Sequence, residues 1–268
     1  MAMSEENTTG LVANPDDEHV SGFFGWKKDR LDFRDYQFGI SVSPLALPPV
    51  VDLRKTMPLV YNQGATNSCT AQAIAACCEY EWITHQKGPD FIPSRLYIYY
   101  NTRWLDNDVN NDNGASLRDG MKAINKWGFC KEPYWPFNVK QVRVSPPNSA
   151  YSDGGTRRVY YYGTVNQNRN ALMGTLASGQ PIIFGIAVYS SFNSNATTKT
   201  GIVPMPRASE SRLGGHAIVL MGYDISTRLY KFRNSWGSRW GDGGYGYLPF
   251  EYVENRNLAS DFWAVRSI

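Results

Sequence analysis

The chain changes from helix-forming to strand-forming sequence near its middle, and this division limits its fold more than any other feature. Residues 69–82 are rich in alanine and free of Gly and Pro over more than three turns, which predicts a long helix. Helical patterns also cover residues 94–104 and the stretch from Ser116 to Gly128, where Ser116 and Asp119 form a capping-box-like start. The first half is therefore predicted to be helical.

The second half alternates short runs of β-branched and aromatic residues with Gly, Asn and Ser, which is typical of strands and turns. One helix, over residues 169–178, is expected to interrupt them because Gly179 and Pro181 follow it. The predicted strands cover residues 159–165, 181–189, 216–224, 229–234 and 245–248.

Helices first and strands second predict an α+β fold of two lobes with a cleft at their junction. We expect a mainly helical lobe over residues 48–150 and a mainly β lobe over residues 151–268. Residues 1–47 have no sustained period and turn aromatic around Phe23-Phe24-Gly25-Trp26 and residues 33–38, so they are predicted to form an arm that lies on the rest of the molecule.

Composition excludes several classes of partner. The net charge of +3 is spread along the chain without a basic stripe, so no nucleic-acid binding is predicted. The longest apolar runs, residues 73–78 and 181–188, are shorter than the roughly 20 residues that a membrane-spanning helix needs. The first 15 residues are acidic and polar, unlike a secretory signal. We therefore expect a monomer without membrane contact, either cytoplasmic or exported by a non-classical route.

Cysteine and histidine are too few and too scattered for a metal site. The four cysteines, at positions 69, 77, 78 and 130, form no paired CxxC motifs, and there are three histidines, at positions 19, 85 and 216. No metal or other cofactor is expected. Cys77 and Cys78 follow two alanines in the long predicted helix, where packing is the favoured interpretation.

Cys69 lies on the first turn of the long helix, just after the turn-forming stretch Asn62-Gln-Gly-Ala-Thr-Asn-Ser68. The free N–H groups and the positive end of the helix dipole lower the pKa of a thiol there toward the reactive thiolate. Taken alone, Cys69 is better interpreted as a buried residue at a helix start, which is the more common fate of a lone cysteine.

Two later motifs also suggest chemistry. Gly214-Gly215-His216-Ala217 opens a predicted strand, which would hold the imidazole rigidly as a base, although a hydrogen-bonded core histidine explains it as well. The stretch from Phe232 to Tyr245 holds four glycines and two tryptophans, a density that packing alone does not require.

Taken together, these motifs resemble the papain family of cysteine proteases. Gln63 before Cys69, the Gly-His-Ala sequence at His216, and Asn234-Ser235-Trp236-Gly237 match that family in order and spacing. The resemblance runs from Val51 to Trp263, and the short N-terminal arm is similar to the bacterial branch that includes xylellain.

The resemblance implies a papain-like fold, with a helical lobe and an antiparallel β-barrel lobe, and a cysteine endopeptidase acting on protein or peptide substrates. Cys69 would attack the scissile carbonyl to form an acyl-enzyme, with His216 as the partner that protonates the leaving amine. Asn234 would orient His216 under the cover of Trp236, and Gln63 with the backbone N–H of Cys69 would bind the oxyanion.

The resemblance also implies substrate contacts. Asn113, Gly114 and Ala115 would pair with an extended peptide, and small residues would line a roomy specificity pocket, although Ser260 is equally explained as plain surface. The residues assigned to the pocket and the cleft around it are Gly185, Gly214, Gly215, Ala217, Trp236 and Ser260.

The sequence also departs from the family pattern. The usual Cys-Gly-Ser-Cys-Trp is Thr66-Asn67-Ser68-Cys69-Thr70 here, so a disulfide common in secreted members is missing, in agreement with a reducing compartment or a fold stable without it. The arm is shorter than the helical propeptides of many relatives. We hypothesise that part of residues 23–38 lies along the cleft as an intramolecular inhibitor, the alternative being an arm packed on the back of one lobe.

Two other functions stay open at this stage. One is a binding or scaffold protein that keeps the fold without turnover, against which Cys69, His216, Asn234 and Gln63 argue. The other is a different thiol enzyme, such as an acyltransferase or cell-wall amidase, in which Asp or a second His usually orients the base. Asn234-Ser235-Trp236-Gly237 favours the protease.

Overall fold

The computed structural model describes residues 23–38, 47–85 and 87–266. The helices within these ranges are α1 (Cys69–Thr84), α2 (Arg95–Leu105), α3 (Leu117–Lys126), α4 (Asn148–Gly154), α5 (Arg169–Ala177), α6 (Asn195–Thr200) and α7 (Phe250–Glu254). The strands are β1 (Trp26–Lys27), β2 (Val50–Asp52), β3 (Ala115–Ser116), β4 (Tyr161–Thr164), β5 (Ile182–Tyr189), β6 (Arg212–Asp224), β7 (Leu229–Arg233), β8 (Tyr245–Pro249) and β9 (Ala259–Arg266).

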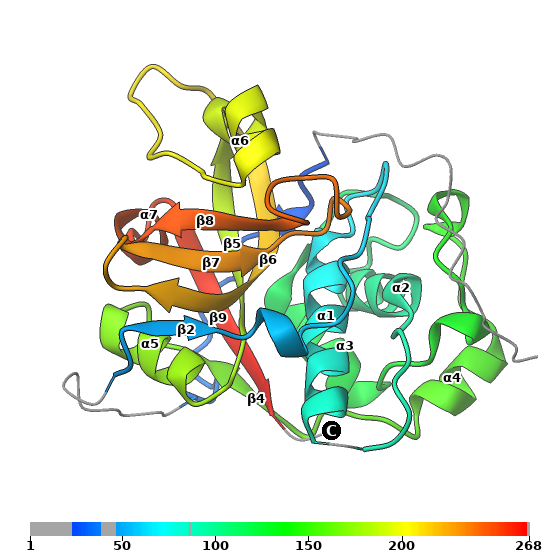
Figure 1. Cartoon of the computed structure of the whole chain (residues 1–268). Coiled ribbons are helices and arrows are strands. Elements are labelled where there is room, and N and C mark those ends of the chain that lie inside the picture. The colour runs from blue at the N-terminus through cyan, green and yellow to red at the C-terminus, as the bar shows by residue number, and fades with distance from the viewer. Residues whose placement is uncertain (1–22, 39–46, 86, 267–268) are drawn as a thin grey trace, which may run out of the picture.

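Helices and strands separate into two lobes, as the sequence predicts. Figure 1 shows α1, α2, α3 and α4 on one side and the twisted sheet on the other, with α1 standing next to the sheet. The sheet lobe carries α5, α6 and α7 at its margins. The expected α+β architecture is confirmed.

The large sheet is antiparallel and open in the part of the chain that the structure describes. Its seven strands run in the order β4-β9-β5-β6-β7-β8, and β2 pairs with β6 from outside this path. Among the described residues, the strand pairings do not join β8 back to β4. The lobe is therefore an open, curved sheet, whereas the resemblance implied a closed barrel. Strands β2 and β9, which the sequence pattern did not predict, both belong to this sheet.

Strand β6 is buried on both faces because it separates two apolar cores. Ala217 and Val219 point into the core shared with the helices, whereas Ile218 and Leu220 point into the core between the sheet and α5 and α7. Side chains alternate between the two faces of a strand, so a strand buried on both sides is apolar without interruption. This explains the run from His216 to Tyr223, and it fixes the strand rigidly beside α1.

Helix α1 is buried along most of its length. Every residue from Cys69 to Glu81 is buried, and the small alanines let the helix lie close to β6. A helix that is buried on all sides is a core helix. Cys77 and Cys78 are fully buried in it, which confirms that they are packing residues. None of the helices in the described ranges is long and apolar enough to cross a membrane.

Candidate active site

Cys69 is the first residue of α1, as predicted, and its side chain has no exposed surface. Its Sγ accepts a hydrogen bond from the backbone N–H of Ala217 over 3.4 Å. Ala217 belongs to β6 and directly follows His216 in the chain. The contact therefore brings the start of the central helix against the strand that carries the histidine.

His216 and Asn234 form a buried pair. Nε2 of His216 lies 2.8 Å from Oδ1 of Asn234, and that same oxygen accepts the backbone N–H of Ser235 over 2.8 Å. The indole of Trp236 covers the imidazole, with ring centroids 4.9 Å apart. Nδ1 of His216 is buried and has no hydrogen-bond partner among the described residues. The imidazole is thus held at one nitrogen while the other remains available.

Gln63 lies between the start of α1 and the segment that carries Asn234. Its Oε1 accepts the hydroxyl of Ser235 over 2.7 Å. Its Nε2 donates to the carbonyl oxygen of Thr66 over 2.8 Å and to that of Phe23 over 3.3 Å. The structure therefore groups all four predicted catalytic residues, Cys69, His216, Asn234 and Gln63, in one buried cluster with part of the arm.

The arm crosses this cluster at residues 23–27. Strand β1 pairs in parallel with β3, and the carbonyl oxygen of Gly25 accepts the backbone N–H of Ala115 over 2.8 Å. On its other side, Gly25 is bridged to Gly215 of β6. A methyl group at position 25 would lie 1.8 Å from the carbonyl oxygen of Asn67, so only glycine fits where the arm passes between the lobes.

Two aromatic residues of the arm cover the predicted substrate-binding glycines. A methyl group at Gly185 would lie 1.9 Å from Cε2 of Trp26, and one at Gly214 would lie 2.7 Å from Cβ of Phe24. Phe24 also lies against His216 and Trp236, with ring centroids 6.3 and 6.1 Å away. The side chains of the arm therefore fill the space that the sequence assigned to a substrate.

The pairing of the strands brings most of the remaining predicted residues together. Gly185 of β5 lies opposite Ala217 of β6 and opposite Ser260 of β9. Gly114 has φ +80°, and a methyl group there would lie 1.9 Å from the carbonyl oxygen of Gly25. Asn113 is the exception, because its side chain is exposed and turns to Asp108, with Nδ2 3.5 Å from Oδ1.

Burial beneath the arm favours the neutral forms of Cys69 and His216. Burial raises the pKa of the Cys69 thiol to about 11, although the backbone N–H groups of Ala217 and Gly25 act in the opposite direction. Burial lowers the pKa of His216 to about 4, although the hydrogen bond to Asn234 acts in the opposite direction. With the arm in place, the charged thiolate and imidazolium forms are both disfavoured at neutral pH.

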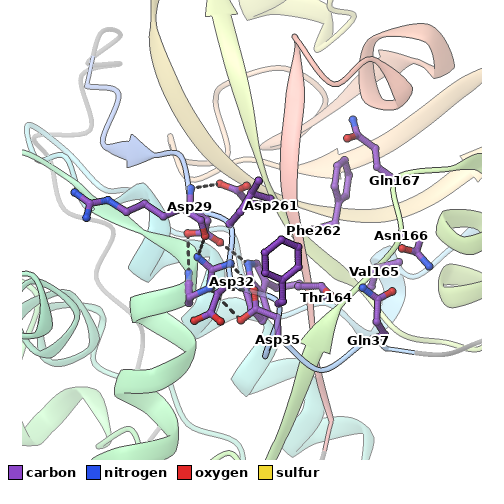
Figure 2. A pocket seen from close by; sticks show the side chains of 15 residues that line it. Asp29, Asp32, Asp35, Gln37, Thr164, Val165, Asn166, Gln167, Asp261 and Phe262 are labelled. Carbon is purple, nitrogen blue, oxygen red and sulfur yellow. Dashed lines mark hydrogen bonds and ion pairs between the residues drawn. The ribbon is translucent and has the colours of Figure 1, made fainter.

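Beyond the cluster, carboxylates fasten the arm to both lobes. The backbone N–H of Asp29 donates to Oδ2 of Asp261 over 2.7 Å, and the side chain of Asp29 accepts the backbone N–H of Arg118 and the indole N–H of Trp263. The guanidinium of Arg118 pairs with Asp35 of the arm. Figure 2 shows these groups around a cavity of about 410 Å³ between the arm, α3 and β9.

Sequence reasoning did not identify Trp26, Asp29 or Asp261 as individual functional residues. The aromatic run at residues 23–26 was the one available signal, and it did not show which ring enters the pocket. The two aspartates lie 232 residues apart in the chain, so their meeting depends on the whole fold. Among the described residues, no group of three or more His, Cys, Asp or Glu side chains is placed to hold a metal ion.

A model of papain family cysteine proteases matches residues 47–262, which is more than half of the chain. The chain belongs to the papain family. This papain-family protease is 37% identical to an uncharacterized peptidase C1-like protein of Acanthamoeba polyphaga mimivirus, over 94% of this chain and 89% of the viral protein. It is 26% identical to cathepsin 7 of Mus musculus, over 76% of this chain and 61% of cathepsin 7.

Solved structures agree with this assignment. The crystal structure of xylellain, a cysteine protease from Xylella fastidiosa, matches with a TM-score of 0.87 and 36% identity, over 94% of this chain and 98% of xylellain. Digestive procathepsin L 3 of Tenebrio molitor matches with a TM-score of 0.68 over 87% of this chain and 75% of that one. At 17% identity, the second likeness concerns the fold alone. The predicted resemblance of this papain-family chain to xylellain is confirmed.

Proposed function

We propose that this papain-family cysteine protease is an endopeptidase that uses Cys69, His216, Asn234 and Gln63, and that its N-terminal arm blocks the cleft until it is displaced. The observation that carries the proposal is the contact between Sγ of Cys69 and the backbone N–H of Ala217, because it places the residue next to His216 against the sulfur.

Peptide hydrolysis divides into two steps in this site. Sγ of Cys69 attacks the carbonyl carbon of the substrate, and His216 passes a proton to the leaving amine, which leaves a thioester on Cys69. Water then attacks the thioester, with His216 taking up a proton from the water and returning it to the sulfur. Asn234 keeps the ring of His216 oriented through Nε2, so that Nδ1 faces the reaction.

Gln63 is proposed to stabilise the negative oxygen that forms during each step. Its side-chain N–H already contacts a peptide carbonyl of the arm, that of Phe23, at 3.3 Å. A donor placed for a peptide carbonyl is able to stabilise the oxyanion derived from it, and removing such a donor typically lowers kcat by about 100- to 1000-fold.

The arm is proposed to act as an intramolecular inhibitor. Phe24 and Trp26 lie against the glycines of the cleft, and neither Cys69 nor His216 has exposed surface. Lys27 pairs with Asp106 and Asp108 of the helical lobe, and the backbone N–H of Phe38 donates to Thr164 of the sheet lobe over 2.6 Å. An arm attached to both lobes holds its central residues over the thiol.

Endopeptidase action is favoured over exopeptidase action by the histidine content. The sequence has three histidines, and none is adjacent to another. The described ones are His85, at the end of α1, and His216, in the site. The sequence therefore holds no adjacent pair of histidines that could bind the terminal carboxylate of a substrate.

The test compares wild type with Cys69→Ala and Gln63→Ala on fluorogenic peptides, with and without Trp26→Ala to loosen the arm. We expect Cys69→Ala to abolish cleavage and Gln63→Ala to lower kcat by about 100-fold or more. Cys130→Ala, which removes another buried thiol, is the matched control and should retain activity. Cleavage that survives Cys69→Ala would overturn the assignment, and exclusive action on isopeptide or cell-wall substrates would favour a different thiol enzyme.

A further inference from the structure

The pocket that Trp26 occupies is shaped for a flat, two-ring side chain. Trp26 is 8% exposed, and atoms of its six-membered ring lie against two glycines. A methyl group at Gly185 would lie 1.9 Å from Cε2 and 2.3 Å from Cζ2, and one at Gly215 would lie 2.7 Å from Cε3. Any side chain at either position would take the space that the indole fills.

Three neighbouring strands supply the floor of this pocket. Gly185 of β5 lies opposite Ser260 of β9 on one side and opposite Ala217 of β6 on the other. Residues directly opposite one another on adjacent strands point to the same face of a sheet. Trp26 and Ala217 belong to one apolar cluster. The floor thus changes from apolar at Ala217 to polar at Ser260.

The polar end of the floor lies beside the N–H of the indole. Nε1 of Trp26 and Oγ of Ser260 are buried and make no hydrogen bond of normal geometry with the described residues. Burial raises the pKa of Asp261. Hydrogen-bonding interactions from the Ser260 hydroxyl and the Trp26 indole lower this pKa, so both groups lie next to the Asp261 carboxylate. An acceptor therefore lies near the indole N–H, although Trp26 does not reach it in good geometry.

Asp261 has φ +59°, in the left-handed region that non-glycine residues seldom adopt. The strained conformation directs its carboxylate toward the arm, where Oδ2 accepts the backbone N–H of Asp29 (Figure 2). Strained residues of this kind gather at binding sites. Trp26 is held by the pairing of β1 with β3, which fixes the position of its indole N–H relative to Ser260 and Asp261.

We propose that this pocket selects peptide substrates that carry a tryptophan side chain, with Gly185 and Gly215 providing the room and Ser260 and Asp261 accepting the indole N–H. The inference rests on the proposed protease function and names the substrate class of that same cleft. Trp26 then occupies the pocket in the way that the preferred substrate side chain does. Displacing the arm exposes the pocket and the thiol together.

The experiment uses full-length Trp26→Ala protein, in which the pocket is vacant and the arm is loosened but still part of the chain. The substrates are quenched fluorescent peptides in which one position near the cleaved bond is varied at a time. The varied residue is Trp, benzothienylalanine, Phe, Leu or Ala. Benzothienylalanine keeps the two rings of Trp and replaces the N–H by sulfur. At one position, we expect kcat/KM for the Trp peptide to exceed that for the Ala peptide by about 100-fold. At the same position, kcat/KM for the Trp peptide should exceed that for the benzothienylalanine peptide by roughly 10-fold, because the latter lacks the N–H.

A second variant tests the role of the floor. Adding Gly185→Ala should lower the ratio of kcat/KM for Trp to that for Ala by about 100-fold, because the added methyl group occupies the place of the indole. Gly155→Ala, which lies outside the cleft after α4, is the matched control and should leave the ratio unchanged. Equal rates for Trp, Leu and Ala peptides at every position would overturn the proposal.

Calorimetry separates this proposal from the protease function. It measures how tightly the same peptides bind to a double variant that carries both Cys69→Ala and Trp26→Ala. Preferred binding of the Trp peptide in the absence of any cleavage by the Trp26→Ala enzyme would support the pocket assignment and overturn the proposed activity. Cleavage by the Trp26→Ala enzyme without preferred binding of the Trp peptide would support the proposed activity and overturn the pocket assignment. Thermal unfolding of each variant confirms that the proteins compared are folded.

Discussion

The backbone N–H of Ala217 donates to Sγ of Cys69 over 3.4 Å, and this contact joins two segments that lie 148 residues apart in the chain. It links the first residue of the buried helix α1 to the strand β6, which is itself buried on both faces. Both partners are therefore fixed by the packing of the whole molecule. Reactivity of the thiol then depends on what covers it, and the following predictions concern that cover and the residues beneath it.

Replacing Gly25 by alanine should open the cleft. The new methyl group would lie 1.8 Å from the carbonyl oxygen of Asn67, and overpacking of this kind typically costs about 1–3 kcal/mol. We expect an epoxysuccinyl inhibitor to label Cys69 roughly 10-fold faster or more than in wild type. Phe33→Ala changes an arm residue that is 99% exposed and should have no effect. Identical labelling of wild type and Gly25→Ala would contradict inhibition by the arm.

Opening the arm should also change the pH dependence of alkylation at Cys69. Burial raises the pKa of this thiol to about 11, so the thiolate is scarce at neutral pH while the arm is docked. In the Trp26→Ala protein, water and the helix dipole can stabilise the thiolate, and its pKa should fall below the usual value near 8.5. The rate of iodoacetamide modification, measured by mass spectrometry from pH 5 to 10, checks this. Cys77, whose pKa burial also raises, provides an internal control that should stay unreactive.

Docking of the arm should weaken as pH rises toward neutrality. Burial and the nearby carboxylate of Asp261 raise the pKa of Asp29 to about 7, while Arg118 and Trp263 act in the opposite direction. In a released arm, this carboxyl would have a pKa near 3.9. A raised pKa in the docked state means that docking takes up a proton, so this contribution is full below about pH 4 and is lost as pH rises to about 7.

Asp29→Asn tests this dependence, because the amide keeps the shape of the side chain and does not ionise. We expect the rate of Cys69 labelling in wild type, divided by that in Asp29→Asn, to rise between pH 4 and pH 7 and then to level off. Ionisation of the Cys69 thiol affects the labelling rate of both proteins equally, so its effect cancels in this ratio. A ratio that stays flat across this range would show that Asp29 does not control the arm.

Asn234→Ala should lower kcat by roughly 100-fold without unfolding the protein, because the imidazole loses the oxygen that orients it. Asn234 also acts to raise the pKa of His216, so its removal should move the acid limb of the pH profile to lower pH. Peptide hydrolysis in a Trp26→Ala background measures both effects. Asn257→Ala, at an exposed position, serves as the control. An unchanged profile would argue against orientation of His216 by Asn234.

Sequence patterns predicted the elements that rest on a regular period. The alanine-rich run became α1, and His216 lies on a strand as expected, although β6 begins at Arg212 and so also includes the two glycines before His216. Strand β9 was missed because Asp261 interrupts it with a left-handed backbone and the register of its pairing with β5 shifts there. The match of Cys69, His216 and Asn234 to the papain family in order and spacing was sufficient to predict that they come together.

The occupant of the cleft could not be predicted with the same detail. The aromatic residues at positions 23–26 suggested contact, but which ring meets Gly185 depends on the pairing of β1 with β3, two strands of two residues each. Strands of two residues are too short to show an alternation of apolar and polar residues in the sequence. The exposed side chain of Asn113 is a similar case, because its loop direction depends on the hydrogen bonds around Asp108.

The arm is anchored on both sides of an exposed stretch, in which Leu31 and Phe33 are almost fully accessible to a protease. A single cut there would leave the segment around Trp26 seated over the thiol but no longer tethered through Asp35 and Phe38. An intramolecular contact would thereby become binding between separate molecules, governed by concentration. If the arm blocks the cleft as proposed, dilution would then release the cut segment, and only a high concentration of that segment would restore the block.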